Sequence, residues 1–198
     1  MIMKRFALVL SVLMLAPAVQ AAEDGKALYA SKGCPACHGA EGRKPLPLQP
    51  NLAGQNSAYL LRQMTEIANG TRSAPAAKPM RPIIEKVSPD ERKVIAAWLA
   101  TQPAAEVTVG SAAKAAQGLD LFEERGCIGC HGADGLKPLS DYPILGGQRK
   151  DYLGAQIRAI RDEVRSTQRA RMMVANVRSF KDAEIDQITE YLSQAKRK

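Results

Sequence analysis

The stretch Cys34-Pro35-Ala36-Cys37-His38-Gly39 decides the fold, because its pattern returns later in the chain as Cys127-Ile128-Gly129-Cys130-His131-Gly132. A shift of 93 residues carries the first stretch onto the second and aligns residues 25–102 with residues 118–195 without a gap. About a third of the aligned positions are identical, which indicates an internal duplication. The chain therefore holds two copies of one ancestral domain.

Cys-x-x-Cys-His is the attachment signature of c-type haem. Two thiols three positions apart reach the two vinyl groups of one porphyrin and form thioethers, and the adjacent histidine lies beneath the ring and ligates the iron. The sequence therefore predicts two covalently attached haem c groups, one in each half. The predicted attachment and ligand residues are Cys34, Cys37 and His38 in the first half and Cys127, Cys130 and His131 in the second.

Other uses of these cysteines fit the pattern less well. Four cysteines in an exported chain would ordinarily form two disulfides, but a histidine directly follows each pair here. A thioredoxin-type pair needs a βαβ setting, and the sequence predicts no strands. A zinc site needs four converging ligands, whereas each half offers only three nitrogen or sulfur ligands, all of them local.

Methionine is the candidate for the sixth iron ligand. Electron-carrying haems are commonly held by a His/Met pair, which raises the potential, and the only two histidines of the chain already lie in the motifs. Under the 93-residue shift only Met80 and Met173 recur, each 42 residues after its histidine, and we predict them as ligands. Met64 is expected to pack in the core. Met172 is the alternative ligand in the second half.

A ligating histidine also needs an acceptor for its other ring N–H, because that bond fixes the orientation of the ring. Pro50 and Pro143 each follow their histidine by 12 residues and begin the sequence Pro-x-Leu-x-Gly-Gln. We predict that their backbone carbonyls accept this bond. A proline that simply turns the loop is compatible with the same role.

The pattern of the chain is helical, and no stretch shows sustained two-residue alternation, so the predicted class is all-α. Ser88-Pro89-Asp90-Glu91 predicts a helix start with a capping box. Asn56 predicts the start of another helix, which Gly70 closes. The remaining helices are expected at residues 149–163 and 182–194, with shorter ones around 24–32 and 115–125.

The first residues predict a signal peptide. Lys4 and Arg5 are followed by an apolar run from Phe6 to Leu15 and by small residues at a cleavage position. We expect residues 1–21 to be removed after Ala21 and the protein to reside in the periplasm. A retained membrane anchor is the alternative, although the run is shorter than the roughly 20 residues that span a bilayer.

The rest of the chain divides into an N-terminal domain over residues 22–103, a linker over 104–113 and a C-terminal domain over 114–198. The linker is rich in small residues, follows Pro103 directly and contains Gly110. Each domain has under 90 residues, a size at which an apolar core is only marginally stabilising, and aromatic residues make up only 5% of the chain. A large apolar cofactor in each domain would complete its core.

The chain has a formal net charge of +8, and removal of residues 1–21 leaves +6. It lacks a basic stretch interleaved with aromatics, so no nucleic-acid partner is expected. A basic concentration flanks Met173, and it is either a solvated face or a surface that steers an acidic redox partner onto the second haem. Its members are Arg158, Arg161, Arg165, Arg169, Arg171 and Arg178.

Over residues 23–195 the sequence resembles the cytochrome c4 family of dihaem cytochromes. The resemblance rests on both Cys-x-x-Cys-His-Gly motifs, on Tyr142-Pro143-Ile144-Leu145-Gly146-Gly147-Gln148 and on the tail from Met173 to Leu192. It implies two tandem class I cytochrome c domains, each with three main helices around one haem, and internal electron transfer between the haems. It also implies His38 with Met80, and His131 with Met173, as the iron ligands.

The expected function is outer-sphere transfer of single electrons between respiratory redox-partner proteins, such as an oxidase, a reductase or a dehydrogenase. We expect no enzymatic activity and no small-molecule substrate, and peripheral membrane association is compatible with this function. One alternative is a dedicated electron-transfer subunit of a larger oxidoreductase, such as a sulfur-oxidising flavocytochrome. Another is a dihaem peroxidase, but a bis-His haem would need histidines that this chain lacks.

Overall fold

A computed structural model describes residues 16–107, 109–139 and 141–197. The basic residues and the apolar run of the predicted signal peptide lie outside this described part, and the predicted cleavage point after Ala21 falls within the first helix, α1 (Ala16–Ser31). Among the described residues, no helix combines the length and the apolar character needed to cross a membrane.

The described residues form helices joined by loops, without strands, so the predicted all-α class is confirmed. Seven of the elements lie in the first half of the chain and six in the second. In the first half they are α1, α2 (Pro35–His38), η1 (Ala40–Gly42), α3 (Ser57–Ala68), η2 (Pro75–Met80), α4 (Arg81–Ile84) and α5 (Pro89–Thr101). In the second half they are α6 (Ala112–Glu124), α7 (Ile128–His131), η3 (Ala133–Gly135), α8 (Lys150–Arg161), α9 (Gln168–Val177) and α10 (Asp182–Gln194).

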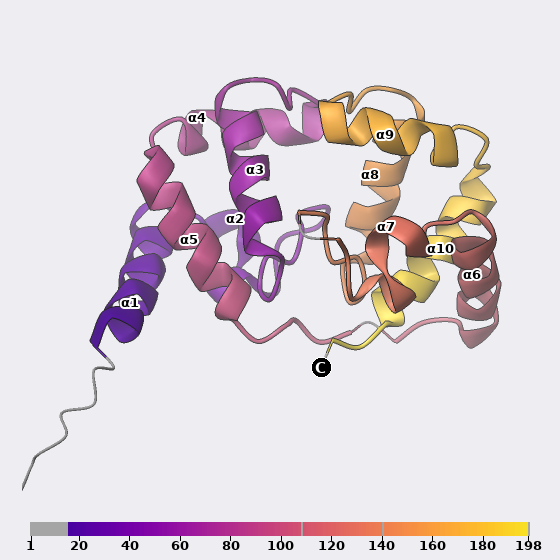
Figure 1. The fold of residues 1–198 in the computed structure, drawn as a ribbon, viewed down its shortest axis with the longest axis horizontal. Helices are drawn as coiled ribbons and strands as arrows, with labels where there is room; N and C mark the ends of the chain where they lie inside the picture. Colours follow the sequence, from indigo (N-terminus) through magenta and orange to yellow (C-terminus); the bar gives the residue numbers. More distant parts are fainter. Residues whose placement is uncertain (1–15, 108, 140, 198) are drawn as a thin grey trace, which may run out of the picture.

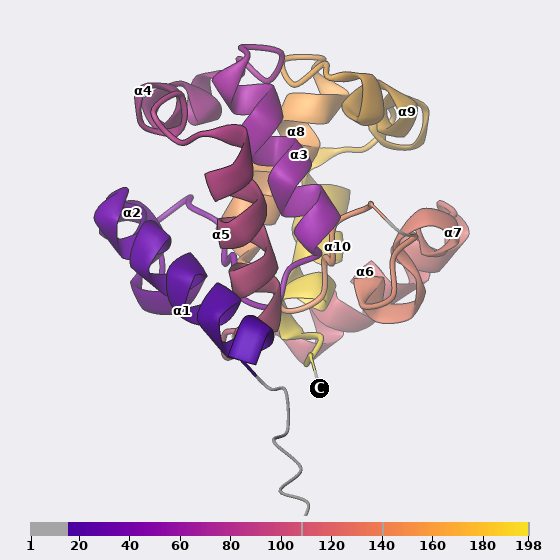
Figure 2. The same ribbon diagram turned by 60° about the vertical axis from the view of Figure 1, so that its left-hand side comes forward.

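The two halves lie side by side with the same arrangement of helices (Figure 1). In the first half α5 packs against α1 and α3, and in the second α10 packs against α6 and α8. In the rotated view of Figure 2 the two halves lie on opposite sides of the molecule, with α1 and α2 opposite α6 and α7 and with α4 opposite α9. The duplication seen in the sequence is therefore a duplication of the fold.

The predicted caps start two of the helices. Asn56 accepts a hydrogen bond at Oδ1 from the backbone N–H of Tyr59, 3.2 Å away, at the start of α3. At the start of α5, Ser88 Oγ accepts from the N–H of Glu91 at 3.2 Å, and Glu91 Oε2 accepts from the N–H of Ser88 at 2.7 Å. Both caps satisfy N–H groups that a helix start leaves without a partner, so local sequence determines where these helices begin.

A glycine in each half lets the first and last helices of the domain cross closely. A Cβ atom added to Gly25 would lie 2.2 Å from the Cβ of Trp98 on α5, and one added to Gly118 would lie 2.1 Å from the carbonyl oxygen of Gln187 on α10. Real Cβ atoms do not approach other atoms this closely, so only glycine allows these helix contacts.

Each half has its own apolar core. The first includes Trp98, Leu99 and Ile95 from α5, and the second includes Ile185, Ile188 and Leu192 from α10. Cysteine and methionine side chains from the predicted haem residues pack at the edge of both cores: Cys34 and Met80 against the first, Cys127 and Met173 against the second. The predicted sites therefore adjoin the cores that support them.

The segment that carries the methionine differs between the halves. In the first half it is η2 followed by the short α4, whereas in the second it is the ten-residue helix α9, which the sequence analysis did not anticipate. The first segment is interrupted by three prolines, Pro75, Pro79 and Pro82, whereas the second contains no proline. Proline lacks a backbone N–H and clashes with the preceding turn, so only the second segment continues as an α-helix.

Candidate haem sites and the interface between them

One continuous cavity runs through both domains. The predicted ligands His38, Met80, His131 and Met173 all line it, together with Cys34, Cys127 and Cys130. Apart from polar groups near the domain interface, the rest of its wall is mainly aliphatic and aromatic side chains from the two cores. A large apolar ring with a few polar substituents fits this wall, because apolar surface lowers the free energy of burying such a ring.

The charged residues of the cavity wall are all arginines. They are Arg62, Arg72, Arg165 and Arg169, and the described lining includes no aspartate or glutamate. Three of these arginines have a buried Nε–H without a hydrogen-bond partner, namely Arg62, Arg72 and Arg165. The only anionic substituents of a haem are its propionates, so the cavity fits haem in charge as well as in its apolar character.

Both histidines lie at the ends of short helices, α2 and α7, and are nearly buried. His38 Nδ1 lies 3.5 Å from the carbonyl oxygen of Pro50, and His131 Nδ1 lies 3.3 Å from that of Pro143. Burial lowers the pKa of both histidines, and the contact with the proline carbonyl partly offsets this. A neutral ring that donates from Nδ1 keeps Nε2 available as a metal ligand.

The four cysteines form no disulfides with one another. Burial raises the pKa of Cys34 and of Cys127, whereas Cys130 is exposed. Each pair spans the first turn of α2 or α7. Both thiols of the second motif line the cavity with His131, whereas in the first motif Cys34 lines it with His38 and Cys37 does not. This arrangement suits attachment of one ring at two points with a ligand between them.

The methionines divide by their surroundings. Met80 ends η2 and packs partly buried against the first core, and Met173 on α9 packs in the same way against the second. Met172 is 58% exposed, although it also lies at the cavity edge, and Met64 is buried within the first core. The partly buried position of Met173 against the second core thus favours it over the exposed Met172 as a ligand. Met64 has the packing role that the sequence predicted.

Tyrosines support the haem motif in each domain, but from different elements. Tyr29 on α1 donates from its hydroxyl to the carbonyl oxygen of Gly39 at 2.8 Å, and Tyr191 on α10 donates to Asp134 Oδ1 at 2.6 Å. Burial raises the pKa of both hydroxyls, and for Tyr191 the bond to Asp134 adds to this, so both stay protonated donors. The rings of Tyr142 and His131 also pack edge-on, with their centroids 5.9 Å apart. The residue that corresponds to Tyr142 in the first domain is Gln49.

Two glutamines join the domains in a reciprocal way that sequence reasoning missed. Gln55 Nε2 donates to the carbonyl oxygen of Ile144 at 2.9 Å, and Gln55 Oε1 accepts from the N–H of Ile144 at 2.7 Å. Gln148 makes the same pair of bonds with Asn51, both at 2.8 Å. Both glutamines are 4% exposed. The repeated Gly-Gln of the two halves was the signal that could have indicated this interface.

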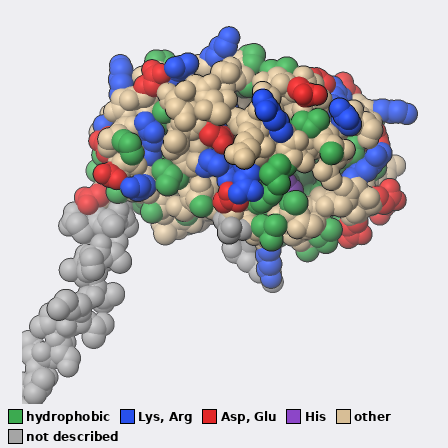
Figure 3. All heavy atoms as spheres, turned by 45° about the horizontal axis from the view of Figure 1, so that its top comes forward, with side chains coloured by type: hydrophobic (Ala, Val, Ile, Leu, Met, Phe, Trp, Pro, Cys, Tyr) green, Lys and Arg blue, Asp and Glu red, His purple; other side chains and the backbone are tan. Residues whose placement is uncertain are grey.

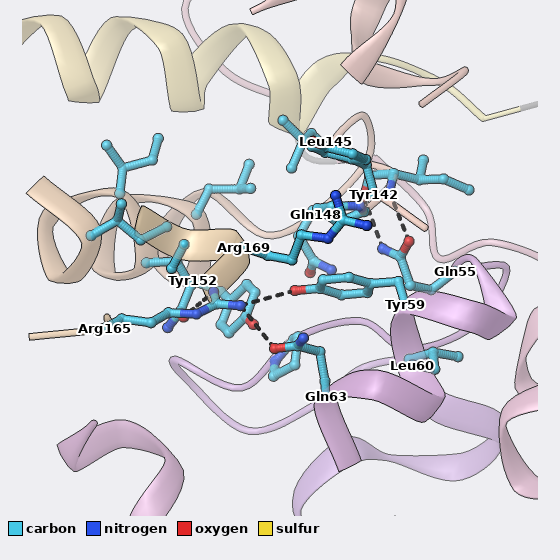
Figure 4. Close-up of a pocket in the computed structure, with 18 of the residues that line it drawn as sticks. Gln55, Tyr59, Leu60, Gln63, Tyr142, Leu145, Gln148, Tyr152, Arg165 and Arg169 are labelled. Carbon is cyan, nitrogen blue, oxygen red and sulfur yellow. Dashed lines mark hydrogen bonds between the residues drawn. The ribbon is translucent and has the colours of Figure 1, made fainter. Parts of the chain in front are cut away.

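A ring of polar side chains crosses the interface next to these glutamines (Figure 4). Arg72 donates to Gln63 Oε1 at 2.9 Å and to Gln156 Oε1 at 3.0 Å. Arg165 donates to the same two oxygens, both at 2.8 Å, and Figure 4 shows it reaching Tyr59 and Gln63 from the other domain. Each glutamine oxygen therefore bonds one arginine of each domain.

The basic concentration around Met173 does not form one surface. Arg165 is buried in the interface, so its assignment to a solvated or docking face is wrong. Arg158 and Arg161 both pair with Asp182, and Arg169 pairs with Asp141. On the face shown in Figure 3, basic side chains are interspersed with acidic ones. Arg171 and Arg178 are the exposed members of the group for which the described residues show no ion pair.

Comparisons with known proteins agree with this arrangement. A cytochrome c family model matches residues 22–103 and again residues 115–196. The cytochrome c4 of Pseudomonas aeruginosa is 33% identical over 80% of this chain and 82% of its own length. A protein of Stutzerimonas stutzeri described as a thiosulfate dehydrogenase electron acceptor is 31% identical, over 94% of this chain and 92% of its own length.

The fold is also that of a solved member. The crystal structure of reduced recombinant cytochrome c4 from Pseudomonas stutzeri superposes with a TM-score of 0.77 at 31% identity, over 88% of this chain and 98% of that one. Two tandem cytochrome c domains bind two covalent haem c groups, and cytochromes of this kind carry electrons rather than catalyse a reaction. This chain belongs to the cytochrome c4 family of dihaem electron-transfer proteins.

Proposed function

We propose that the protein carries single electrons between respiratory redox-partner proteins in the periplasm, after removal of residues 1–21 behind Ala21. The observation that carries this proposal is the continuous cavity that holds both predicted ligand sets and crosses the domain interface. A carrier with two such sites accepts an electron in one domain and releases it from the other.

In this proposal Cys34 and Cys37 attach one haem and Cys127 and Cys130 the other. The iron of each bound haem supplies the one-electron chemistry. His38 and Met80 ligate the first iron, His131 and Met173 the second, and the carbonyls of Pro50 and Pro143 orient the two histidines. The chain keeps the ligand set rigid because the methionines pack against the cores and the histidines are buried, so little reorganisation accompanies electron transfer.

The second domain is the proposed contact point for a partner. Cys130 is exposed there and lines the cavity, as does Met172, which is 58% exposed; Ile128, within the same attachment motif, is 42% exposed. Exposed apolar side chains around a haem attachment point offer a partner close approach to the ring edge. Arg171 and Arg178 add positive charge on this side, which favours a partner with an acidic patch.

A dehydrogenase that oxidises a sulfur compound is the second candidate for the electron donor. The observation in its favour is the relative described as a thiosulfate dehydrogenase electron acceptor, which matches almost the full length of this chain. In that case the protein serves as the dedicated acceptor of one enzyme, and it purifies with that enzyme as a stable complex instead of as a free carrier.

The first test is an optical spectrum of the purified protein, oxidised and reduced, with haem quantified against protein. Two haems per chain, both low-spin when reduced, with the weak far-red sulfur-to-iron band when oxidised, support two His/Met carriers. A high-spin haem that binds carbon monoxide readily contradicts one methionine assignment. Reduction by a candidate donor at low and high salt then tests the contact point, since a rate independent of ionic strength contradicts electrostatic docking.

A further inference from the structure

A loop of the first domain holds one residue in a strained backbone conformation. Leu48 has a φ of +63°, in the left-handed region that residues with a Cβ rarely adopt. The repeated fold does not require this conformation, because Asp141, which corresponds to Leu48 in the second domain, does not have a positive φ. Strain of this kind persists only where the surroundings hold it, and it is typical of sites that have a function.

The second domain holds this loop in place. Asp151 on α8 accepts a hydrogen bond at Oδ2 from the N–H of Leu48 at 2.9 Å, and Arg149 donates to the carbonyl oxygen of Pro45 at 3.3 Å. A hydrogen bond from Arg149 also holds the pKa of Asp151 at about 2, so the carboxylate is ionised at neutral pH. The first domain has Ala58 at the position of Asp151, so it cannot hold the second-domain loop in the same way.

The held loop exposes apolar side chains at the edge of the cavity in the first domain. Leu46 and Leu48 are 54% and 58% exposed, and Pro47 between them is exposed as well. Leu48 lines the cavity, and the N–H of Leu46 donates to the carbonyl oxygen of Cys37 at 3.0 Å. The exposed stretch therefore lies beside the motif that is proposed to attach the first haem.

The corresponding loop of the second domain has different chemistry. Leu139 is 56% exposed and corresponds to Leu46, but Asp141 stands in the place of Leu48. Asp141 forms ion pairs with Arg62 and Arg169. Beside their attachment motifs, the first domain thus presents a continuous apolar stretch and the second a leucine next to an ion-paired group.

Charge and area together indicate what the first-domain stretch contacts. Its charged neighbours Arg43 and Arg149 pair within the chain, with Glu41 and Asp151, and Lys44 is an exposed charge for which the described residues show no ion pair. One positive charge gives little electrostatic attraction. Two leucines and a proline cover far less than the roughly 800 Å² per partner of a stable complex, whereas small interfaces are typical of transient electron-transfer encounters.

We propose that Leu46-Pro47-Leu48 is a docking surface for a redox partner that presents an uncharged apolar patch, and that Asp151 of the second domain positions this surface. The proposal rests on the proposed function, since docking at this edge matters only if the first cavity holds a haem. The protein then has two contact points of unlike chemistry, because Arg171 and Arg178 add charge at the contact point on the second domain. Docking at the apolar surface is insensitive to salt, since apolar contact does not depend on charge screening.

The test compares electron exchange of the holoprotein with gold electrodes that carry either a methyl-terminated or a carboxylate-terminated alkanethiol monolayer, by cyclic voltammetry at low and high salt. We expect Leu48→Asn to lower the ratio of the methyl-surface rate to the carboxylate-surface rate about tenfold, the factor expected from the loss of one leucine contact. Asparagine tolerates the left-handed backbone, so the loop keeps its conformation. Asp151→Ala releases the loop and is expected to lower the same ratio. Leu139→Asn, which changes the matched exposed leucine of the second domain, is expected to leave it unchanged.

An unchanged ratio in Leu48→Asn would overturn the docking surface, and so would an equal fall in Leu139→Asn. An unchanged ratio in Asp151→Ala would remove the positioning role of Asp151. A dimer of the wild-type protein in sedimentation that Leu48→Asn abolishes would show that a second copy of the chain covers this surface instead of a redox partner. Failure of the wild-type holoprotein to exchange electrons at either monolayer would contradict the carrier function itself, and the docking surface with it.

Discussion

Replacement of Gln55 by alanine is expected to loosen the contact between the domains. The substitution removes both bonds to Ile144, at 2.7 and 2.9 Å, together with the bond from the N–H of Asn56 at 2.9 Å. It leaves the N–H of Ile144 without its partner and the carbonyl with only a longer bond, 3.4 Å from Arg197, in an interface where Gln55 itself is 4% exposed. The pair of bonds made by Gln148 in the other direction remains.

The size of the effect follows from the groups left unpaired. A fully buried polar group without a partner costs about 1–3 kcal/mol. Ile144 is only partly buried, so hydrogen bonds to water reduce this cost. About 1 kcal/mol for the N–H left without a partner and about 1 kcal/mol for the bond lost by the carbonyl give a loss of about 2 kcal/mol in the free energy of opening the interface. Since about 1.4 kcal/mol is a factor of ten, the open state becomes about 30-fold more populated.

Hydrogen exchange at the backbone N–H of Asn51 measures this opening at a contact that the substitution does not change. The N–H of Asn51 is bonded to Gln148 Oε1 at 2.8 Å, so it exchanges only when that other half of the interface opens. We expect its protection in Gln55→Ala to fall about 30-fold. Gln117→Ala is the control, because it removes an exposed glutamine bond, to Gln187, within one domain. Unchanged protection at Asn51 would refute a cooperative interface and leave the two glutamine contacts independent.

Three further perturbations test the sites and the scaffold. Met173→Ala is expected to make the second haem high-spin and able to bind carbon monoxide, whereas Met172→Ala leaves the spectrum unchanged; the reverse result exchanges their roles. Gly118→Ala places a Cβ 2.1 Å from a backbone oxygen of α10 and should destabilise the protein by about 1–3 kcal/mol in thermal unfolding. A hydrogen bond from Arg149 holds the pKa of Asp151 at about 2, below its ordinary 3.8, so its stabilisation is present above about pH 4 and disappears as the pH falls toward 2. Because a third of the side chain is exposed, this amounts to about 1 kcal/mol, and Asp151→Asn should remove that part of the pH dependence.

The sequence by itself determined the features that depend on local chemistry. Two Cys-x-x-Cys-His motifs in a repeat were enough to predict a dihaem cytochrome, because attachment and the first iron ligand need only five consecutive residues. Helix starts at Asn56 and Ser88 were predicted from caps that act over three residues, and both are confirmed. The all-α class and the electron-carrier function, to which the family comparisons also point, are confirmed as well.

Only the tertiary structure decided how the two domains meet. The bonds of Gln55 and Gln148 join residues 89 and 97 positions apart, and those between Arg72 and Gln156 join residues 84 apart. The repeat made these residues visible as identities, but it could not indicate that each one contacts the opposite copy instead of its own haem site. A repeat records which side chains both domains share, whereas the geometry of their contact depends on how two complete cores pack, and that geometry placed Arg165 in the interface rather than on the surface.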